Sequence, residues 1–274
     1  MAATVQFPVR KITPTEQSEI QDMLAVEEPL EIRLAYGPEK ARVEKAVSIT
    51  MRTPGNDEEL ALGFLFTEGI IREKNAVRQV RLTDSVNGNI AIVEFQPHIT
   101  PVLDTLERHF YTSSSCGVCG KSSLDAIKTK SIFRLEPNGF TISGSILYTL
   151  SDLLRQNQGV FELTGGLHAS AIFDANGNLI QVREDVGRHN ALDKLLGYFL
   201  GENNLPLNNH ILLLSGRVSF ELMQKACMAG VTMVAAIGAP SSLAVRMAEE
   251  FDITLIGFLR DKRFTIYSGK QRIL

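Results

Sequence analysis

Residues 211–258 read ILLLSGRVSFELMQKACMAGVTMVAAIGAPSSLAVRMAEEFDITLIGF, and this stretch decides the fold. Short runs of branched apolar residues alternate in it with longer segments of helical periodicity. The pattern predicts strands and helices in turn, in the order Ile211–Leu214, Phe220–Ala229, Thr232–Ile237, Leu243–Phe251 and Ile253–Phe258. Strands and helices that alternate at this pitch indicate βαβ units, so we expect an α/β fold with a parallel portion of sheet.

The segments that precede this stretch fit the same fold. A helix is expected over Ser145–Gln156, and Asn176-Gly177 is typical of a hairpin turn. A further helix is predicted by an apolar face formed by Leu192, Leu195, Leu196, Phe199 and Leu200.

The first hundred or so residues read as a strand-rich α+β unit. Strands are expected at Val43–Thr50, Val77–Thr83 and Ile90–Phe95, the last after a tight-turn signal at Asn87-Gly88. Asn56 and Glu59 have the spacing of a capping box, which predicts a helix start there. We therefore expect two domains, an α+β domain over residues 1–112 and an α/β domain over residues 113–274.

Bulk composition indicates a globular protein of ordinary kind. The chain has 274 residues, of which 44% are hydrophobic and 22% charged, and its formal net charge is −3. Sequence-independent nucleic-acid binding usually requires a basic surplus, which is missing here. The apolar runs fall short of the roughly 20 residues that span a bilayer, and the N-terminus lacks the pattern of a secretion signal. We expect a cytoplasmic protein that acts on neither membranes nor nucleic acids.

A small, polar tract at residues 111–123, YTSSSCGVCGKSS, carries the strongest chemical signal. Its composition predicts a loop, and Cys116 and Cys119 form a C-x-x-C motif in it. A third cysteine, Cys227, lies in a predicted helix. Three cysteines are too few for a disulfide framework, and a close pair in a reducing compartment is more often catalytic, redox-active or metal-binding.

Four interpretations of the cysteine pair compete. Packing is disfavoured by small hydrophilic neighbours, and a structural zinc site needs about four ligands, which one pair and five scattered histidines do not obviously supply. A thioredoxin-like motif would follow a strand directly, whereas three serines precede Cys116. A persulfide carrier needs an exposed, mobile thiolate, which a Gly/Ser-rich loop beside Lys121 provides. The residues alone leave redox chemistry and sulfur transfer both open.

Loops at the ends of the parallel strands are predicted to bind an anion. In open α/β sheets, ligands lie beyond the carboxyl ends of the strands, where helix N-termini point at them. Here the sequences SGRVS (residues 215–219) and GAPSS (residues 238–242) each join a strand to a helix. Glycine permits close backbone approach, and Arg217, Ser241 and Ser242 can contact phosphate. Ordinary helix capping is the alternative for each loop.

Three further segments are candidates for binding. Arg188 and His189 stand in a strongly polar stretch before a helix, and His168 follows a Gly-Gly pair at the start of an apolar segment. Each also has a structural interpretation, as a solvated helix entry or a hydrogen-bonded core histidine. Near the C-terminus, residues 258–264 (FLRDKRF) form either a plain turn or a basic rim for a polyanion.

Together these segments resemble the formate dehydrogenase accessory sulfurtransferase family, FdhD. The stretches that carry the resemblance are MRTPGNDEELALGFLFTEGII, SSSCGVCGK, TGGLHASAIFD, VREDVGRHNALDKLLG, SGRVSFELMQKA, APSSLAVRMAEE and GFLRDKRFTIY, which span about residues 51 to 267. Several are long and particular, so the resemblance is specific.

The resemblance implies a function and a set of partners. Members of this family accept sulfur from a cysteine desulfurase and pass it to the molybdenum bis(molybdopterin guanine dinucleotide) cofactor destined for formate dehydrogenase. The persulfide cysteine of the family corresponds to Cys116, with Cys119 as its partner, and no protein-ligated metal is expected. The cofactor-binding segment corresponds to Phe258, Leu259, Arg260, Asp261, Lys262 and Arg263, and a guanine nucleotide is expected to mimic the cofactor there.

The resemblance also implies a fold and an assembly. It implies a homodimer whose C-terminal domain is a three-layer, cytidine-deaminase-like unit. Deamination itself is disfavoured, because Ser170 stands where the H-x-E motif of zinc deaminases requires glutamate. Two other functions remain as alternatives: a thiol–disulfide oxidoreductase and a non-enzymatic cofactor chaperone.

Overall fold

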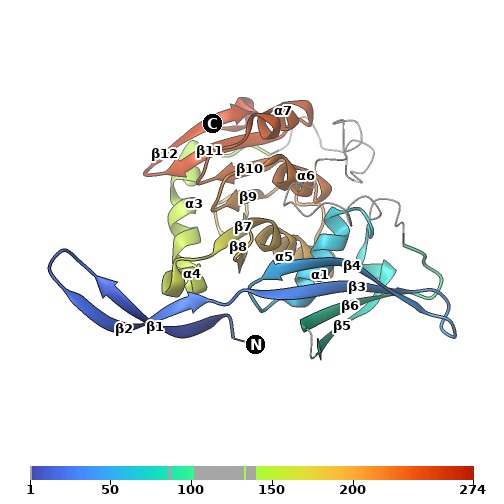
Figure 1. The fold of residues 1–274 in the computed structure, drawn as a ribbon. Coiled ribbons are helices and arrows are strands. Elements are labelled where there is room, and N and C mark those ends of the chain that lie inside the picture. The colour runs from blue at the N-terminus through green and yellow to red at the C-terminus, as the bar shows by residue number, and fades with distance from the viewer. Residues whose placement is uncertain (1, 86–87, 102–132, 134–139) are drawn as a thin grey trace.

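A computed structural model describes residues 2–85, 88–101, 133 and 140–274, and Figure 1 shows its fold. The C-x-x-C pair and the predicted domain boundary near residue 112 lie outside the described residues. None of the helices described there is long and apolar enough to cross a membrane.

The larger sheet has six strands in the order β12-β11-β10-β9-β7-β8. Its strands are β7 (His168–Phe173), β8 (Leu179–Asp185), β9 (Ile211–Leu214), β10 (Met233–Ala236), β11 (Thr254–Arg260) and β12 (Arg263–Ser268). The central strands β9, β10 and β11 are parallel, whereas β7, β8 and β12 join in antiparallel register. The α/β fold and its parallel portion, predicted from the alternating elements, are confirmed.

Helices cover both faces of this sheet, because its central strands carry apolar residues on both sides. Helix α3 (Gly144–Gln156) packs on one face through Leu147, Leu150 and Leu154. The other face is covered by α5 (Arg188–Gly201), α6 (Phe220–Met228) and α7 (Ser242–Glu250). The result is a three-layer arrangement, visible in Figure 1.

The smaller sheet has the order β4-β3-β6-β5 and is formed by β3 (Glu28–Tyr36), β4 (Val43–Arg52), β5 (Val77–Ser85) and β6 (Gly88–Phe95). Helix α1 (Asp57–Thr67) packs on it, and a short 3-10 turn, η1 (Lys74–Ala76), precedes β5. The predicted strands and the antiparallel pairing of β5 with β6 are confirmed. The predicted helix start is confirmed, since α1 begins at Asp57. The capping box is wrong: Asn56 adopts a left-handed backbone conformation with φ of 57° and its side chain caps nothing, while Glu59 pairs with Arg183 instead.

The two sheets share one hydrophobic core, because α1 and α5 cross in direct contact. A Cβ atom added at Gly63 would lie 1.8 Å from the carbonyl oxygen of Asp193, and one at Gly197 would lie 1.9 Å from that of Glu59. Only glycine allows backbones to approach this closely. The side chains of the N-terminal sheet and of α5 therefore belong to a single buried cluster.

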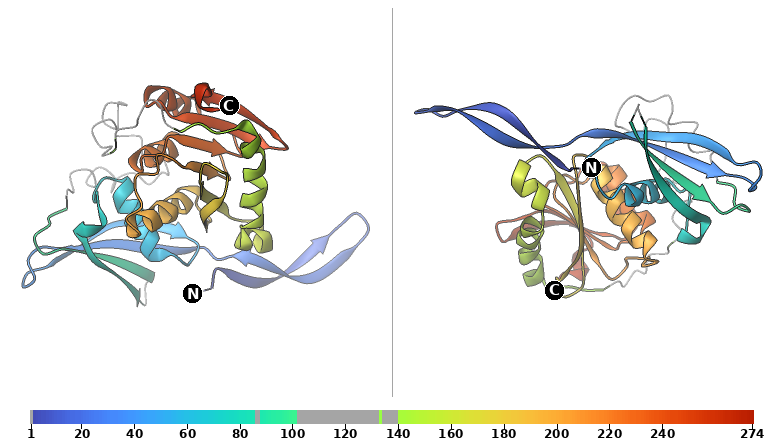
Figure 2. Two further views of the ribbon diagram at one scale, coloured as in Figure 1. Left: turned by 180° about the vertical axis from the view of Figure 1, so that it is seen from behind. Right: turned by 90° about the horizontal axis from the view of Figure 1, so that it is seen from below.

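A two-stranded arm projects from this body, and the sequence analysis did not predict it. Strands β1 (Thr4–Ile12) and β2 (Gln17–Ala25) pair in antiparallel register and form a sheet of their own. The two views of Figure 2 show the arm reaching well past the rest of the molecule. Its base lies beside the short helix α4 (Gly159–Thr164), and the chain ends in a second 3-10 turn, η2 (Lys270–Arg272).

Candidate functional site

The loops after the parallel strands are bonded to one another and form one continuous rim. Val218 donates its backbone N–H to Ala239 (3.1 Å), and Ser241 donates to Val218 (2.9 Å). Gly238 donates to Gly216 (3.2 Å) and accepts from Phe258 (3.1 Å). A Cβ atom at Gly238 would lie 2.8 Å from the Gly216 oxygen, so this close approach requires glycine. The structure thus brings the two predicted junction loops and the start of the 258–263 segment to the same edge of the sheet.

His168 reaches this edge because β7 runs antiparallel to β9. Ser170 lies opposite Leu214, so His168 lies beyond the carboxyl end of β9, and a Cβ atom at Gly216 would be 3.2 Å from its Nδ1. Burial lowers the pKa of His168, and the neighbouring side chains of Arg188 and His189 lower it further. Its imidazole is therefore mainly neutral at pH 7 and offers one donor and one acceptor.

Arg188 and His189 enter the same edge from the first turn of α5. The Nε2 atom of His189 lies 3.4 Å from the Ser219 hydroxyl and 3.6 Å from a carboxylate oxygen of Glu221. His189 and, to a lesser degree, Ser219 lower the pKa of Glu221 to about 2, against the effect of burial. The Nε atom of Arg188 is buried and has no hydrogen-bond partner within the described part of the chain. A buried donor of this kind favours an acceptor supplied by a ligand.

Asp185 fixes the loop that carries these two residues, and sequence reasoning did not single it out. Its fully buried carboxylate lies 2.7 Å from Lys194 Nζ and accepts hydrogen bonds from the backbone N–H of Thr53 (3.2 Å) and Gly187 (2.8 Å). The Asn190 side chain donates to it as well, at 3.1 Å. Lys194 also donates to the Thr53 carbonyl oxygen at 2.8 Å. The network joins the end of β4 to the entry of α5, and so holds Arg188 and His189 in place.

The 258–263 segment forms a hairpin between β11 and β12. Asp261 and Lys262 have φ angles of 53° and 54°, as a tight turn with two left-handed residues requires, and Arg260 and Arg263 face each other across it. A hollow of about 320 Å³ lies here, lined by Phe258, Arg260, Arg263, Phe264 and Thr265. The two arginines are exposed and available to an anion. Leu259, by contrast, is buried in the core beside α3, so its side chain is not accessible to a ligand.

The remaining predicted residues lie at helix starts near the rim. Arg217 is exposed. Ser241 caps α7 by accepting from the backbone N–H of Ala244 (3.2 Å), as the capping alternative expected, and Ser242 is the first residue of that helix. Ser219 caps α6 in the same way. No group of three or more His, Cys, Asp and Glu side chains that could hold a metal occurs among the described residues.

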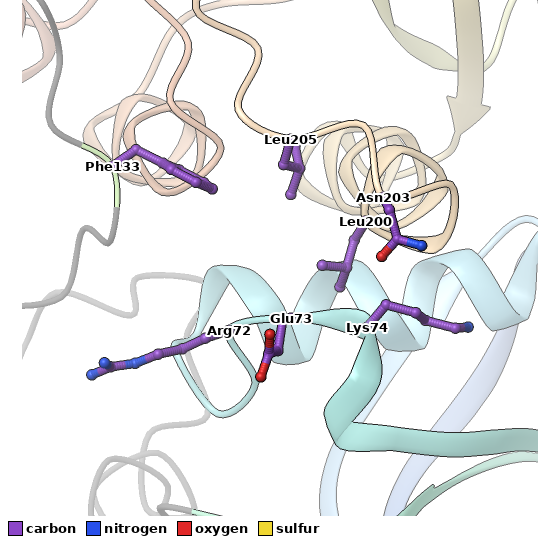
Figure 3. A pocket seen from close by; sticks show the side chains of 7 residues that line it. All are labelled: Arg72, Glu73, Lys74, Phe133, Leu200, Asn203 and Leu205. Atoms are coloured by element: carbon purple, nitrogen blue, oxygen red, sulfur yellow. The ribbon is translucent and has the colours of Figure 1, made fainter.

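A second, larger hollow of about 480 Å³ lies at the opposite end of α5. Figure 3 shows the side chains that line it: Arg72, Glu73, Lys74, Phe133, Leu200, Asn203 and Leu205. Because α5 has 14 residues at about 1.5 Å each, roughly 20 Å separates this hollow from Arg188. It is therefore distinct from the strand-end rim.

Comparison with known proteins agrees with the sequence pattern. The model of the FdhD/NarQ family matches residues 25–274. A sulfur carrier protein FdhD from Mycolicibacterium paratuberculosis is 46% identical over 280 residues, which cover 100% of both chains. One of the same name from Streptomyces avermitilis is 46% identical, covering 92% of this chain and 89% of that protein.

A solved structure supports the fold. The crystal structure of a protein from Desulfotalea psychrophila, described as a formate dehydrogenase accessory protein, superposes with a TM-score of 0.74 at 21% identity and covers 100% of both chains. Since the family model matches most of the chain and the relatives share well over a third of their residues with it, this chain belongs to the FdhD/NarQ family.

Proposed function

We propose that this chain is a sulfurtransferase that carries sulfur as a persulfide on Cys116 or Cys119. The sulfur is transferred to the molybdenum bis(molybdopterin guanine dinucleotide) cofactor before the cofactor enters formate dehydrogenase. The names of the relatives, sulfur carrier protein and formate dehydrogenase accessory protein, support this role. The proposal includes a cytoplasmic homodimer whose six-stranded part is related to cytidine deaminases.

Sulfur loading follows from thiol chemistry. A thiolate of the C-x-x-C pair attacks the terminal sulfur of a cysteine desulfurase persulfide, and the desulfurase cysteine leaves as a thiolate. The chain then holds a persulfide. Attack by the second thiolate on the inner sulfur forms a disulfide and releases sulfide, so the two thiols supply the two electrons that sulfide requires. A cellular thiol must reduce the disulfide before the next cycle.

Cofactor binding is supported above all by the strand-end rim. His168, Arg188, His189 and Arg217 meet there with the N-termini of three helices, α5, α6 and α7. Helix N-termini and the planar guanidinium groups of arginine favour binding of a diphosphate. The hairpin that carries Arg260 and Arg263 adds positive charge beside Phe258. A guanosine diphosphate end of the cofactor fits these groups, and a homodimer would offer two such sites to a ligand with two similar ends.

Guanosine diphosphate should therefore stabilise the protein. At a ligand concentration ten times the dissociation constant, native-state binding contributes about 1.4 kcal/mol, which corresponds to a rise of about 3 °C in Tm for a chain of this size. Differential scanning fluorimetry at millimolar nucleotide, in a buffer without phosphate, measures this rise, and guanosine should give little of it.

A pair of arginine variants makes the nucleotide test specific. Arg217→Gln should lose most of the nucleotide-induced rise in Tm. Arg78→Gln should keep this rise, because Arg78 lies on β5 in the smaller sheet and pairs with Glu39. A wild-type protein that shows no rise with nucleotide, or an Arg217→Gln protein that keeps the full rise, would count against this placement of the cofactor.

A further inference from the structure

The β1–β2 arm has one mainly apolar and one mainly polar face. In the antiparallel register Val5 lies opposite Leu24 and Val9 lies opposite Ile20. Phe7 stands between these pairs on the same face, where its partner Asp22 is the one acidic residue. The alternate residues form the other face, which is mainly polar and contains the ion pair of Arg10 with Glu19 at 2.8 Å. Such a division of side chains is typical of a ribbon that packs on something through one face.

The apolar face of the arm is exposed. Phe7 is 53% exposed, Val5 42% and Leu24 39%, and no residue of β1 or β2, all of which are described, is buried. A hairpin of two strands without a third strand or a helix along its length is at best marginally stable in water. The arm therefore needs a surface to pack against, and its outer part extends away from its own body (Figure 2).

The arm is suited to contact through its face rather than its edge. Pro8 stands in the middle of β1 and has no N–H to offer to a further strand, which blunts that edge against strand addition. The family model, moreover, matches from residue 25, the last residue of β2. The arm is thus an addition to the part of the chain that this family model describes.

The size of the apolar face favours a second copy as its occupant. Each strand has nine residues, or about 30 Å, and a ribbon about 10 Å wide then offers roughly 300 Å² per face. One arm on an unrelated partner buries about 600 Å² in total, which is below the size of a stable interface. Two arms exchanged across a two-fold axis bury about 1,200 Å², which reaches the lower limit for stable, specific complexes.

The same chain also exposes an apolar surface that a second arm can cover. Ile49 and Met51 on β4 are 71% and 47% exposed. They face away from α5, because Thr50 between them contacts Asn190 of that helix at 3.1 Å. We infer that the β1–β2 arm is a dimerisation device whose apolar face, at Phe7 and Ile20, packs against a second copy of this chain. The inference rests on the homodimer of the proposed function, and it adds which surface forms the contact between the two copies.

Sedimentation velocity on the full chain between about 1 and 50 µM tests this assignment. The wild type should be a dimer. The double variant Phe7→Lys/Ile20→Lys should raise the dimer dissociation constant by roughly 100-fold or more, because each charge enters the interface twice. The matched variant Gln6→Lys/Gln21→Lys adds the same charge at neighbouring exposed positions of the polar face and should remain dimeric.

The outcomes of this experiment distinguish the homodimer itself from the role of the arm in forming it. Both variants should keep the wild-type circular dichroism spectrum of the folded body, since the arm adds no residue to the core. Loss of the dimer should lower the melting temperature of Phe7→Lys/Ile20→Lys only by the stabilisation that association gives the folded chain. A monomeric wild type would overturn both the homodimer and the role of the arm. A Phe7→Lys/Ile20→Lys protein as dimeric as the wild type would overturn the arm alone. Sulfur loading, measured by intact mass, is independent of either result and tests the sulfur carrier separately.

Discussion

Replacement of Asp185 by alanine should lower the free energy of unfolding by about 4 kcal/mol, because it leaves a buried ammonium without its counter-ion. Asp185 is fully buried and Lys194 is 1% exposed, with 2.7 Å between the charged atoms. The substitution also removes the acceptor for the N–H groups of Thr53 and Gly187. Urea unfolding followed by circular dichroism measures the loss.

Two further variants show whether the buried charge is the cause. Asp185→Leu/Lys194→Met removes both charges and should be markedly more stable than Asp185→Ala, since a buried pair can often be replaced by apolar groups at little cost. Asp152→Asn removes an exposed negative charge on α3 and should change stability by less than about 0.5 kcal/mol. If the free energy of unfolding of Asp185→Ala were within about 1 kcal/mol of the wild-type value, the Asp185 network would not be what holds the entry of α5 in place.

The Asp185→Ala substitution should also weaken nucleotide binding. Asp185 positions Arg188 and His189 without facing the rim itself, through Gly187 and Asn190. A loosened entry to α5 should therefore lower the affinity for guanosine diphosphate at temperatures where Asp185→Ala is still folded. Rigid positioning of binding groups by surrounding hydrogen bonds is a general requirement of such sites.

The elements that the sequence predicted are those whose periodicity is local. Strand β9 was predicted with its observed bounds, because four consecutive apolar residues are bounded by a glycine-containing loop. The arm and β3 were not predicted. The arm has no buried side, so its alternation of apolar and polar residues is broken by Asp22 and Pro8 and gives a weak strand signal.

The candidate site was predictable in its loops but not in its support. The glycine- and serine-containing loops at residues 215–219 and 238–242 indicate strand-to-helix connections from local sequence alone. The position of His168, by contrast, depends on β7 running antiparallel beside β9. The role of Asp185 depends on Thr53, 132 residues away in sequence. The capping box failed because Glu59 pairs with Arg183, a partner that local spacing cannot reveal.

Loss of the persulfide in a cysteine variant is the other large effect that we expect. After incubation with a cysteine desulfurase and cysteine, the wild type should gain roughly 32 Da per persulfide in intact mass under non-reducing conditions, and a reductant should remove the gain. Cys116→Ala should abolish it, because the family resemblance assigns the persulfide to the first cysteine of the motif. Cys119→Ala should keep the gain and lose the release of sulfide, which needs the second thiol.

Cys227 provides the matched control within the same chain. It is 1% exposed in the core, and burial raises the pKa of its thiol to about 12, so the thiol stays protonated at pH 8. Cys227→Ala should therefore load sulfur like the wild type. A gain that survives in Cys116→Ala and disappears in Cys119→Ala would move the persulfide to the second thiol. A wild type that only loses about 2 Da, through a disulfide, would instead indicate a redox dithiol and contradict the sulfur carrier.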